Sequence, residues 1–183
     1  MREGEDPYEL INAEIEKSPP GARGVYFLPY LLGERSPRWN PNAKGAWIGL
    51  KLQNKREDLL RAVLEGVSLN LGVILAVIGE FVPAREMILI GGGAKGSTWQ
   101  QLLADVFDLP VLVPERLEEA TSMGAAIIGG VGVGCFESFD SAERFVRIKH
   151  RLDPDPERVR LYRAMRPLFD DCYRALEPIF KMI

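Results

Sequence analysis

Met87-Ile88-Leu89-Ile90-Gly91-Gly92-Gly93-Ala94-Lys95-Gly96-Ser97 is the stretch that decides the fold. Its first four residues are apolar and predict a buried strand, and three consecutive glycines follow where that strand ends. Ser97 with Gln100 indicates the start of a helix. Strand, glycine turn and helix in this order are typical of a phosphate site, because glycines let the backbone approach an anion and a helix N-terminus offers free N–H donors.

Strands and helices alternate on both sides of this unit. Downstream, the pattern predicts a strand, a helix of small residues and an amphipathic terminal helix, at Pro110–Val113, Ala120–Val131 and about 155–182. Upstream, it predicts a short helix, two strands and a long helix, at Asp6–Lys17, Val25–Leu32, Gly45–Leu50 and Lys55–Phe81. This order indicates an α/β fold with a partly parallel sheet, in one domain that spans residues 1–183.

The long helix carries the strongest periodic signal. Asn54 and Glu57 predict a capping pair at its start. An apolar stripe then recurs at helical spacing and is predicted to be the buried face: Leu60, Val63, Leu64, Val67, Leu71, Ile74 and Ile78. Gly66 and Gly72 each cost about 1 kcal/mol against alanine, so we expect another backbone to approach the helix there.

Composition excludes several classes of function. The 183 residues carry a formal net charge of −3, which gives no general attraction to nucleic acid or to an anionic membrane. The two cysteines, Cys135 and Cys172, have no metal-ligand spacing, and no metal site is predicted. No signal peptide is recognised and no run of about 18 uninterrupted apolar residues occurs, so a cytoplasmic protein without a membrane span is expected.

Two phosphate-binding motifs compete for the glycine loop. A Walker A loop requires Gly-Lys-Ser/Thr, whereas Lys95 is followed by Gly96 and Ser97, so that motif fails. Gly91, Gly93 and Gly96 do match the dinucleotide-binding pattern G-x-G-x-x-G, and Glu115 follows the next strand. A Rossmann loop normally opens its domain, however, and here some ninety residues come first. The Rossmann interpretation therefore stays open as the weaker alternative.

Several motifs resemble the FGGY family of carbohydrate kinases. Gly45-Ala46-Trp47-Ile48-Gly49-Leu50, followed after seven residues by Asp58-Leu59-Leu60-Arg61-Ala62-Val63-Leu64-Glu65, is similar to the second family signature. The run from Phe27 to Pro37, continued by Asn40 to Gly45, resembles the xylulokinase branch. The glycine loop, Met123-Gly124-Ala125-Ala126 and Asp153-Pro154-Asp155-Pro156-Glu157-Arg158 fit as well, so the resemblance covers nearly the whole chain.

The resemblance implies a fold and an activity. The fold would be the C-terminal half of an actin/hexokinase-type (ribonuclease H-like) ATPase, and the reaction would be transfer of the ATP γ-phosphoryl group, with magnesium, to a ketopentose such as xylulose. The family pattern implies that Gly91, Gly92 and Gly93 approach the nucleotide phosphates and ribose. It implies that Ala94, Lys95 and Gly96 line the adenine and ribose side.

The same resemblance implies parts that lie outside these residues. In the family, the general-base aspartate and the sugar-binding residues belong to an N-terminal domain, and two strands with a phosphate loop precede the segment matched here. We therefore expect no catalytic residue in this chain, which would need the sugar and the N-terminal kinase domain as partners. Alone, it is expected to form a homodimer through a free strand edge at Gly45. A non-catalytic nucleotide-binding or oligomerisation module derived from such a kinase is the alternative.

Overall fold

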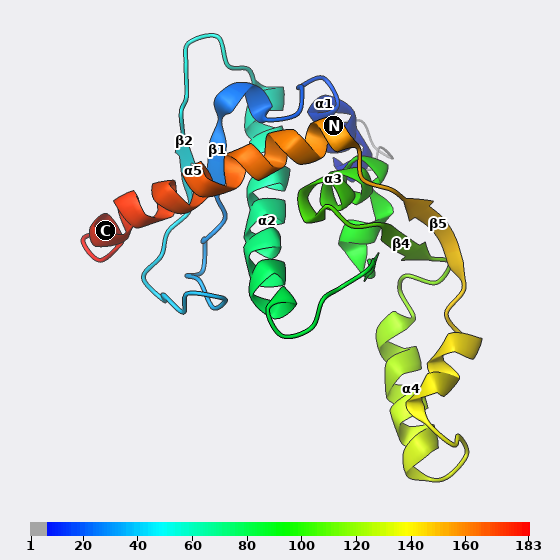
Figure 1. The fold of residues 1–183 in the computed structure, drawn as a ribbon. Helices are drawn as coiled ribbons and strands as arrows, with labels where there is room; N and C mark the ends of the chain where they lie inside the picture. Colours follow the sequence, from blue (N-terminus) through cyan, green and yellow to red (C-terminus); the bar gives the residue numbers. More distant parts are fainter. Residues whose placement is uncertain (1–6) are drawn as a thin grey trace.

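The computed structural model describes residues 7–183 and forms an arch of two small sheets joined by long helices. Figure 1 shows the long helix α2 (Arg56–Gly79) in the middle, with one sheet on either side of it. The terminal helix α5 (Pro156–Phe180) crosses α2 and spans the arch. The described residues therefore confirm the predicted mixture of helices and strands.

The first sheet is a two-stranded antiparallel ribbon of β1 (Tyr26–Leu28) and β2 (Ala46–Ile48), in which Tyr26 lies opposite Ile48. It follows helix α1 (Pro7–Ile15) and a 3-10 turn, η1 (Ala22–Gly24). The predicted strands at Val25–Leu32 and Gly45–Leu50 are both longer than the real ones. Pro29 ends the first, because proline has no N–H to give to a strand ladder.

Helix α2 begins one residue later than predicted and is capped differently. The carboxylate of Asp58 accepts a hydrogen bond of 3.0 Å from the backbone N–H of Lys55. The predicted pair of Asn54 and Glu57 is therefore wrong, and Asn54 instead accepts from the backbone N–H of Lys51 at 2.7 Å.

The buried face of α2 is not the predicted apolar stripe. Leu71 and Ile78, which belong to that stripe, are 39% and 52% exposed. The helix instead buries small and polar residues: Asp58, Arg61, Ala62, Glu65, Gly66, Ser68, Leu69 and Gly72. Close packing explains the small ones, since a Cβ atom on Gly66 would lie 2.0 Å from the carbonyl oxygen of Phe27. The predicted close approach of another backbone is thus confirmed at Gly66, whereas at Gly72 the neighbours are the side chains of Arg166 and Val106. The other five residues of the predicted stripe are half-buried, so the most deeply buried face is not the predicted one.

Hydrogen bonds explain the polar members of this face. Glu65 is 1% exposed, and its Oε1 accepts from the backbone N–H of Gly21 at 2.8 Å, from Arg61 Nε at 2.8 Å and from the Tyr162 hydroxyl at 2.9 Å. By length and composition alone, α2 would suit a membrane span. Its buried charges, bonded to other elements, identify it as a core helix of this fold.

The second sheet has the order β3-β4-β5, with β3 (Met87–Ile88) and β4 (Val111–Pro114) parallel and β5 (Ile148–Leu152) antiparallel to β4. This confirms a partly parallel sheet, although β3 is shorter than the predicted Met87–Ile90. Strand β5 was not predicted from the sequence. It forms an edge with four exposed residues in succession, so it shows none of the alternation that marks a half-buried strand.

Helix α3 (Ser97–Phe107) covers one face of this sheet, with Leu103 and Ala104 packed against Val111 and Val113. Its N-cap is Gly96, so the predicted start at Ser97 is right, but no side-chain cap forms there. Helix α4 (Ala120–Gly132) and the 3-10 segment η3 (Phe139–Arg144) extend away from the sheet as a separate arm (Figure 1).

Helix α5 unites the two halves of the arch. Tyr162, Phe169 and Tyr173 are at most 2% exposed and pack into one core with Leu28 of β1 and Val106 of α3. The helix begins after Asp155, whose carboxylate accepts from the backbone N–H groups of the next turn, as expected for an N-cap. Its bounds of 156–180 agree with the predicted helix at about 155–182.

Candidate functional site

The glycine loop lies at the carboxyl edge of the parallel strands β3 and β4. Gly91 follows β3 closely, and Glu115 and Arg116 follow β4 directly. Since the strands are parallel, both connections leave the sheet at the same edge. Ligands of open α/β sheets bind at this edge, because the loops and helix N-termini converge there. The structure thus places the predicted loop where a ligand would be expected.

Gly91 and Gly92 form the accessible part of the loop. Gly91 has φ +81°, a backbone conformation that residues with side chains rarely adopt. It leads into a 3-10 turn, η2 (Gly92–Lys95). Both glycines are exposed, and a Cβ atom added to either one would meet nothing within 4 Å. Their backbone therefore borders open space rather than another element, which suits the approach of a ligand.

Gly93 has a different role, in packing. A Cβ atom on Gly93 would lie 2.8 Å from the ring of Trp99, so only glycine fits beneath this side chain. The Trp99 indole donates a hydrogen bond of 2.9 Å to the Ser68 hydroxyl of α2. Trp99 thereby anchors α3 to α2, and the third glycine holds the loop against its ring.

Ala94 and Gly96 face the protein. Ala94 is fully buried, and its carbonyl oxygen accepts from the Gln100 side-chain amide at 2.5 Å. A Cβ atom on Gly96 would lie 3.3 Å from the side chain of Asn12 in α1. The six predicted site residues are therefore brought together in one loop, but the Ala94 side chain is out of reach of a ligand.

Lys95 links the two loops at this edge. Its Nζ lies 2.5 Å from Oε1 of Glu118, in the segment after β4. The hydrogen bond and the charge of Lys95 hold the pKa of the Glu118 carboxyl below its ordinary value. Both side chains are well exposed, so water weakens the attraction within this pair. The lysine can therefore still be reached by an incoming anion.

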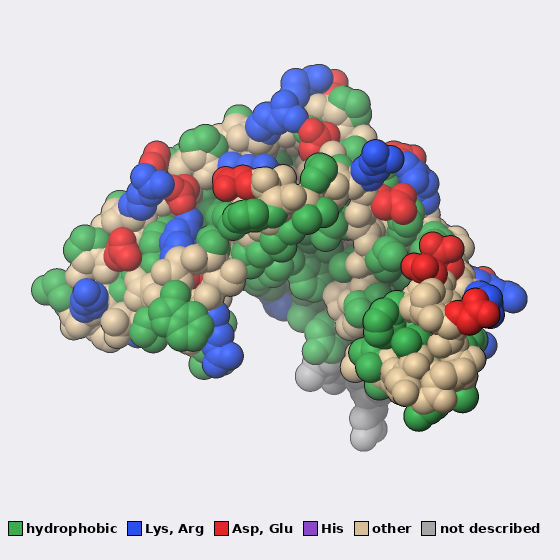
Figure 2. Space-filling model, turned by 60° about the horizontal axis from the view of Figure 1, so that its bottom comes forward, with side chains coloured by type: hydrophobic (Ala, Val, Ile, Leu, Met, Phe, Trp, Pro, Cys, Tyr) green, Lys and Arg blue, Asp and Glu red, His purple; other side chains and the backbone are tan. Residues whose placement is uncertain are grey.

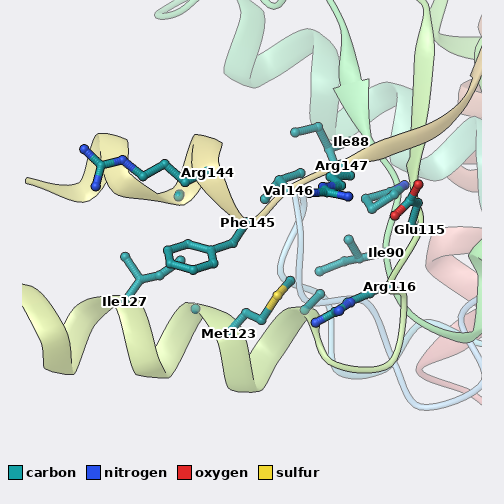
Figure 3. Close-up of a pocket in the computed structure, with 14 residues that line it drawn as sticks. Ile88, Ile90, Glu115, Arg116, Met123, Ile127, Arg144, Phe145, Val146 and Arg147 are labelled. Atoms are coloured by element: carbon teal, nitrogen blue, oxygen red, sulfur yellow. The ribbon is translucent and has the colours of Figure 1, made fainter. Parts of the chain in front are cut away.

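A hollow of about 460 Å³ adjoins the loop, between the sheet edge, α4 and the segment that enters β5. Figure 3 shows Met123 and Ile127 rising from α4 toward Phe145, with Ile90, the residue before Gly91, beside them. Apolar side chains thus dominate its interior. No pattern in the sequence indicated this hollow, because the 142–147 segment is brought beside the loop only by the unpredicted strand β5.

The rim of this hollow is basic. Arg116, Arg144 and Arg147 line it together with Glu115, and within residues 7–183 none of the three arginines forms an ion pair. Among the same residues, no group of three His, Cys, Asp or Glu side chains could hold a metal ion. The site therefore offers glycine backbone, apolar surface and positive charge, which together fit a ligand with an anionic part.

Comparison with known proteins gives a consistent picture. The sequence pattern described as "FGGY family of carbohydrate kinases, C-terminal domain" matches residues 2–133. Among curated relatives, a "Gluconokinase" of Bacillus licheniformis is 39% identical over all of this chain and 36% of its own length. A "Xylulose kinase" of Bacillus subtilis (strain 168) is 34% identical over 92% of this chain and 34% of its own.

A solved structure agrees with these sequences. The ligand-bound xylulose kinase from Lactobacillus acidophilus superimposes with a TM-score of 0.88 and 25% identity, covering 97% of this chain and 36% of that protein. The chain thus spans about a third of the length of the relatives that it matches.

Proposed function

The chain belongs to the FGGY family of carbohydrate kinases and has the fold of their C-terminal domain, and from this premise we propose that its glycine loop binds ATP. The family, together with the actin/hexokinase type of fold, favours this function over the dinucleotide-binding alternative. In the proposed arrangement, the backbone of Gly91 and Gly92 approaches the phosphates, and Lys95 adds a positive charge beside them.

One observation carries the proposal: Gly91 and Gly92 are open to solvent, at the carboxyl edge of a parallel strand pair. Glycines that served packing alone would resemble Gly93, whose missing side chain makes room for Trp99. Magnesium enters as the ion that accompanies the nucleotide phosphates, since Mg²⁺ is commonly held by one or two carboxylates plus substrate phosphates. We assign it no ligand in this chain.

The substrate and the second half of the site belong to the same proposal. The chain would act with an N-terminal domain that supplies the sugar contacts and the catalytic base, because phosphoryl transfer depends on groups from both sides of a cleft. Xylulose is our first candidate, supported by the motifs between Phe27 and Gly45 and by the xylulose kinase neighbours. Gluconate is the second, supported by the gluconokinase relatives.

Calorimetric titration with ADP–magnesium, ATP–magnesium and NAD tests the nucleotide site. Gly92→Asp places a carboxylate at the loop without a strained φ and without a clash, so repulsion should abolish adenine-nucleotide binding. Gly129→Asp is the matched control, since this glycine of α4 also has open space around it. An equal loss of adenine-nucleotide binding in both variants, or tighter binding of NAD than of ATP and ADP, would contradict the proposal.

A non-catalytic oligomerisation module remains the second candidate, and one observation favours it. Apolar residues of α2, β3 and α4 are exposed in the described structure, among them Val77, Ile78, Ile88 and Ile128. Figure 2 shows apolar side chains gathered inside the hollow of the arch. An apolar surface of this kind marks a site of association. Light scattering of the isolated chain should find a dimer, and a monomer at all concentrations would argue against this module.

A further inference from the structure

A second hollow of about 670 Å³, lined by none of the glycine-loop residues 91–96, lies between the end of α1, the polar face of α3 and the start of α5. Its lining is rich in cations. Four basic side chains face two acidic ones there: Lys17, Arg23, Arg61 and Arg158 against Glu16 and Asp105. The hollow therefore presents more positive than negative charge to a ligand, although the whole chain is acidic.

Arg61 is the most firmly placed of the four. Its Nε donates to Glu65 at 2.8 Å, and its two terminal nitrogens donate to the Ser18 carbonyl at 3.0 Å and to the Tyr162 hydroxyl at 3.3 Å. A guanidinium has five N–H donors, so two remain available. Because the side chain is only 10% exposed and fixed on three sides, its orientation needs no further ordering when a ligand binds.

Arg23 is likewise fixed by contacts on the side that faces the protein interior. It forms an ion pair with Asp58, a fully buried carboxylate that also accepts from the Ser18 hydroxyl at 2.6 Å. Neither Asp58 nor Glu65 lines the hollow. The carboxylates that compensate the two arginines thus lie in the interior, and the cationic edges face the open space.

Asp105 offers a hydrogen-bond acceptor to a ligand in this hollow. It is 1% exposed, and its Oδ1 accepts from the backbone N–H of Asp155 at 2.9 Å and from the Gln101 amide at 2.8 Å. Its Oδ2 is buried without a hydrogen bond and forms an ion pair with the Arg158 guanidinium at 3.3 Å. Buried carboxylate oxygens are rarely left in this state, since each lost hydrogen bond is costly. A hydroxyl donor on a ligand would satisfy this atom.

We propose that this hollow binds a small phosphorylated polyol. The phosphate would accept hydrogen bonds from Arg61 and Arg23, with Lys17 nearby, because guanidinium forks match phosphate oxygens in geometry and charge. A hydroxyl of the same ligand would donate to Asp105 Oδ2. None of the glycine-loop residues lines this hollow, so the proposal does not depend on nucleotide binding at that loop.

Calorimetry and amide chemical shifts of the full chain test this site with three probes: D-ribose 5-phosphate, inorganic phosphate and D-ribose. We expect the sugar phosphate to bind most tightly and the free sugar not to bind. The double variant Lys17→Gln/Arg158→Gln removes two of the four cations that line the hollow, and the weaker attraction for phosphate should reduce this binding about tenfold. Arg163→Gln is the control, because this arginine lies on the same helix, pairs with Asp108 and does not line the hollow.

Two further variants keep the test decisive. Lys17→Gln alone removes an exposed charge and should weaken binding without loss of folding, which circular dichroism would check. Asp105→Asn should reduce the preference for ribose 5-phosphate over inorganic phosphate. The proposal is overturned by absence of binding at millimolar ribose 5-phosphate, by equal affinity in the double variant and the control, or by displacement of the probe with ATP–magnesium. It is also overturned if inorganic phosphate binds equally well and Asp105→Asn changes nothing.

Discussion

Gly66→Ala should destabilise the protein, even though alanine is the better helix former. The exchange gains up to about 1 kcal/mol of helix propensity inside α2. The added Cβ atom, however, would lie 2.0 Å from the carbonyl oxygen of Phe27 and 3.2 Å from its Cβ atom, so helix and strand must separate. Adding one carbon to a well-packed interior costs about 1–3 kcal/mol, and more where backbone is the obstacle.

The net expectation is a loss of about 2 kcal/mol in the free energy of unfolding, or about 4–8 °C in the melting temperature of a chain of this size. Urea unfolding followed by circular dichroism measures it. Gly129→Ala is the matched control: it lies inside α4 with nothing within 4 Å, so it should be neutral or stabilising. A Gly66→Ala protein as stable as the control would refute the close contact between α2 and β1.

Two more predictions concern charged groups. Burial works to raise the pKa of Asp58, but hydrogen bonds from the Ser18 hydroxyl and the Lys55 backbone outweigh it and hold that pKa below the ordinary value of 3.8. Since the unfolded carboxyl binds its proton first, stability should fall as the pH drops through about 4 and below, and urea midpoints of Asp58→Asn should lack this component. Glu118→Gln removes the acid paired with Lys95 and should strengthen ATP binding a few-fold by titration, whereas unchanged or weaker binding would argue against a phosphate beside Lys95.

The sequence predicted the order of elements well, because that order depends on local signals. The glycine run after β3 and the Asp-Pro-Asp-Pro segment before α5 act within a few residues of themselves, whereas the prediction ran past Pro29, which ends β1. The glycine loop was therefore found at the right end of the right strand. Strand β5 was not predicted, because an exposed edge strand need not show alternating apolar and polar residues.

The polar core could not be predicted for the opposite reason. Glu65 is buried because Gly21 and Tyr162, 44 and 97 residues away, bring donors to it. No pattern within α2 shows which acid will find such donors. The sequence likewise does not distinguish the three glycines at 91–93. Only the position of the Trp99 ring in the fold separates the packing glycine, Gly93, from the two accessible ones.

The apolar stripe of α2 indicates a surface that a further domain would cover. Helical periodicity reports where apolar residues lie, and burial in the described structure follows only if something covers them. Here Leu71 and Ile78 of the stripe are exposed and its other five members are only half-buried, and most of the apolar helix α4 is exposed as well. The relatives are about three times as long as this chain. If the proposed N-terminal domain covers these surfaces, the periodicity was right about the assembled kinase and wrong only for this part. Adding that domain should then protect the amides of α4 and of the C-terminal half of α2 from hydrogen exchange, and leave those of α5 unchanged.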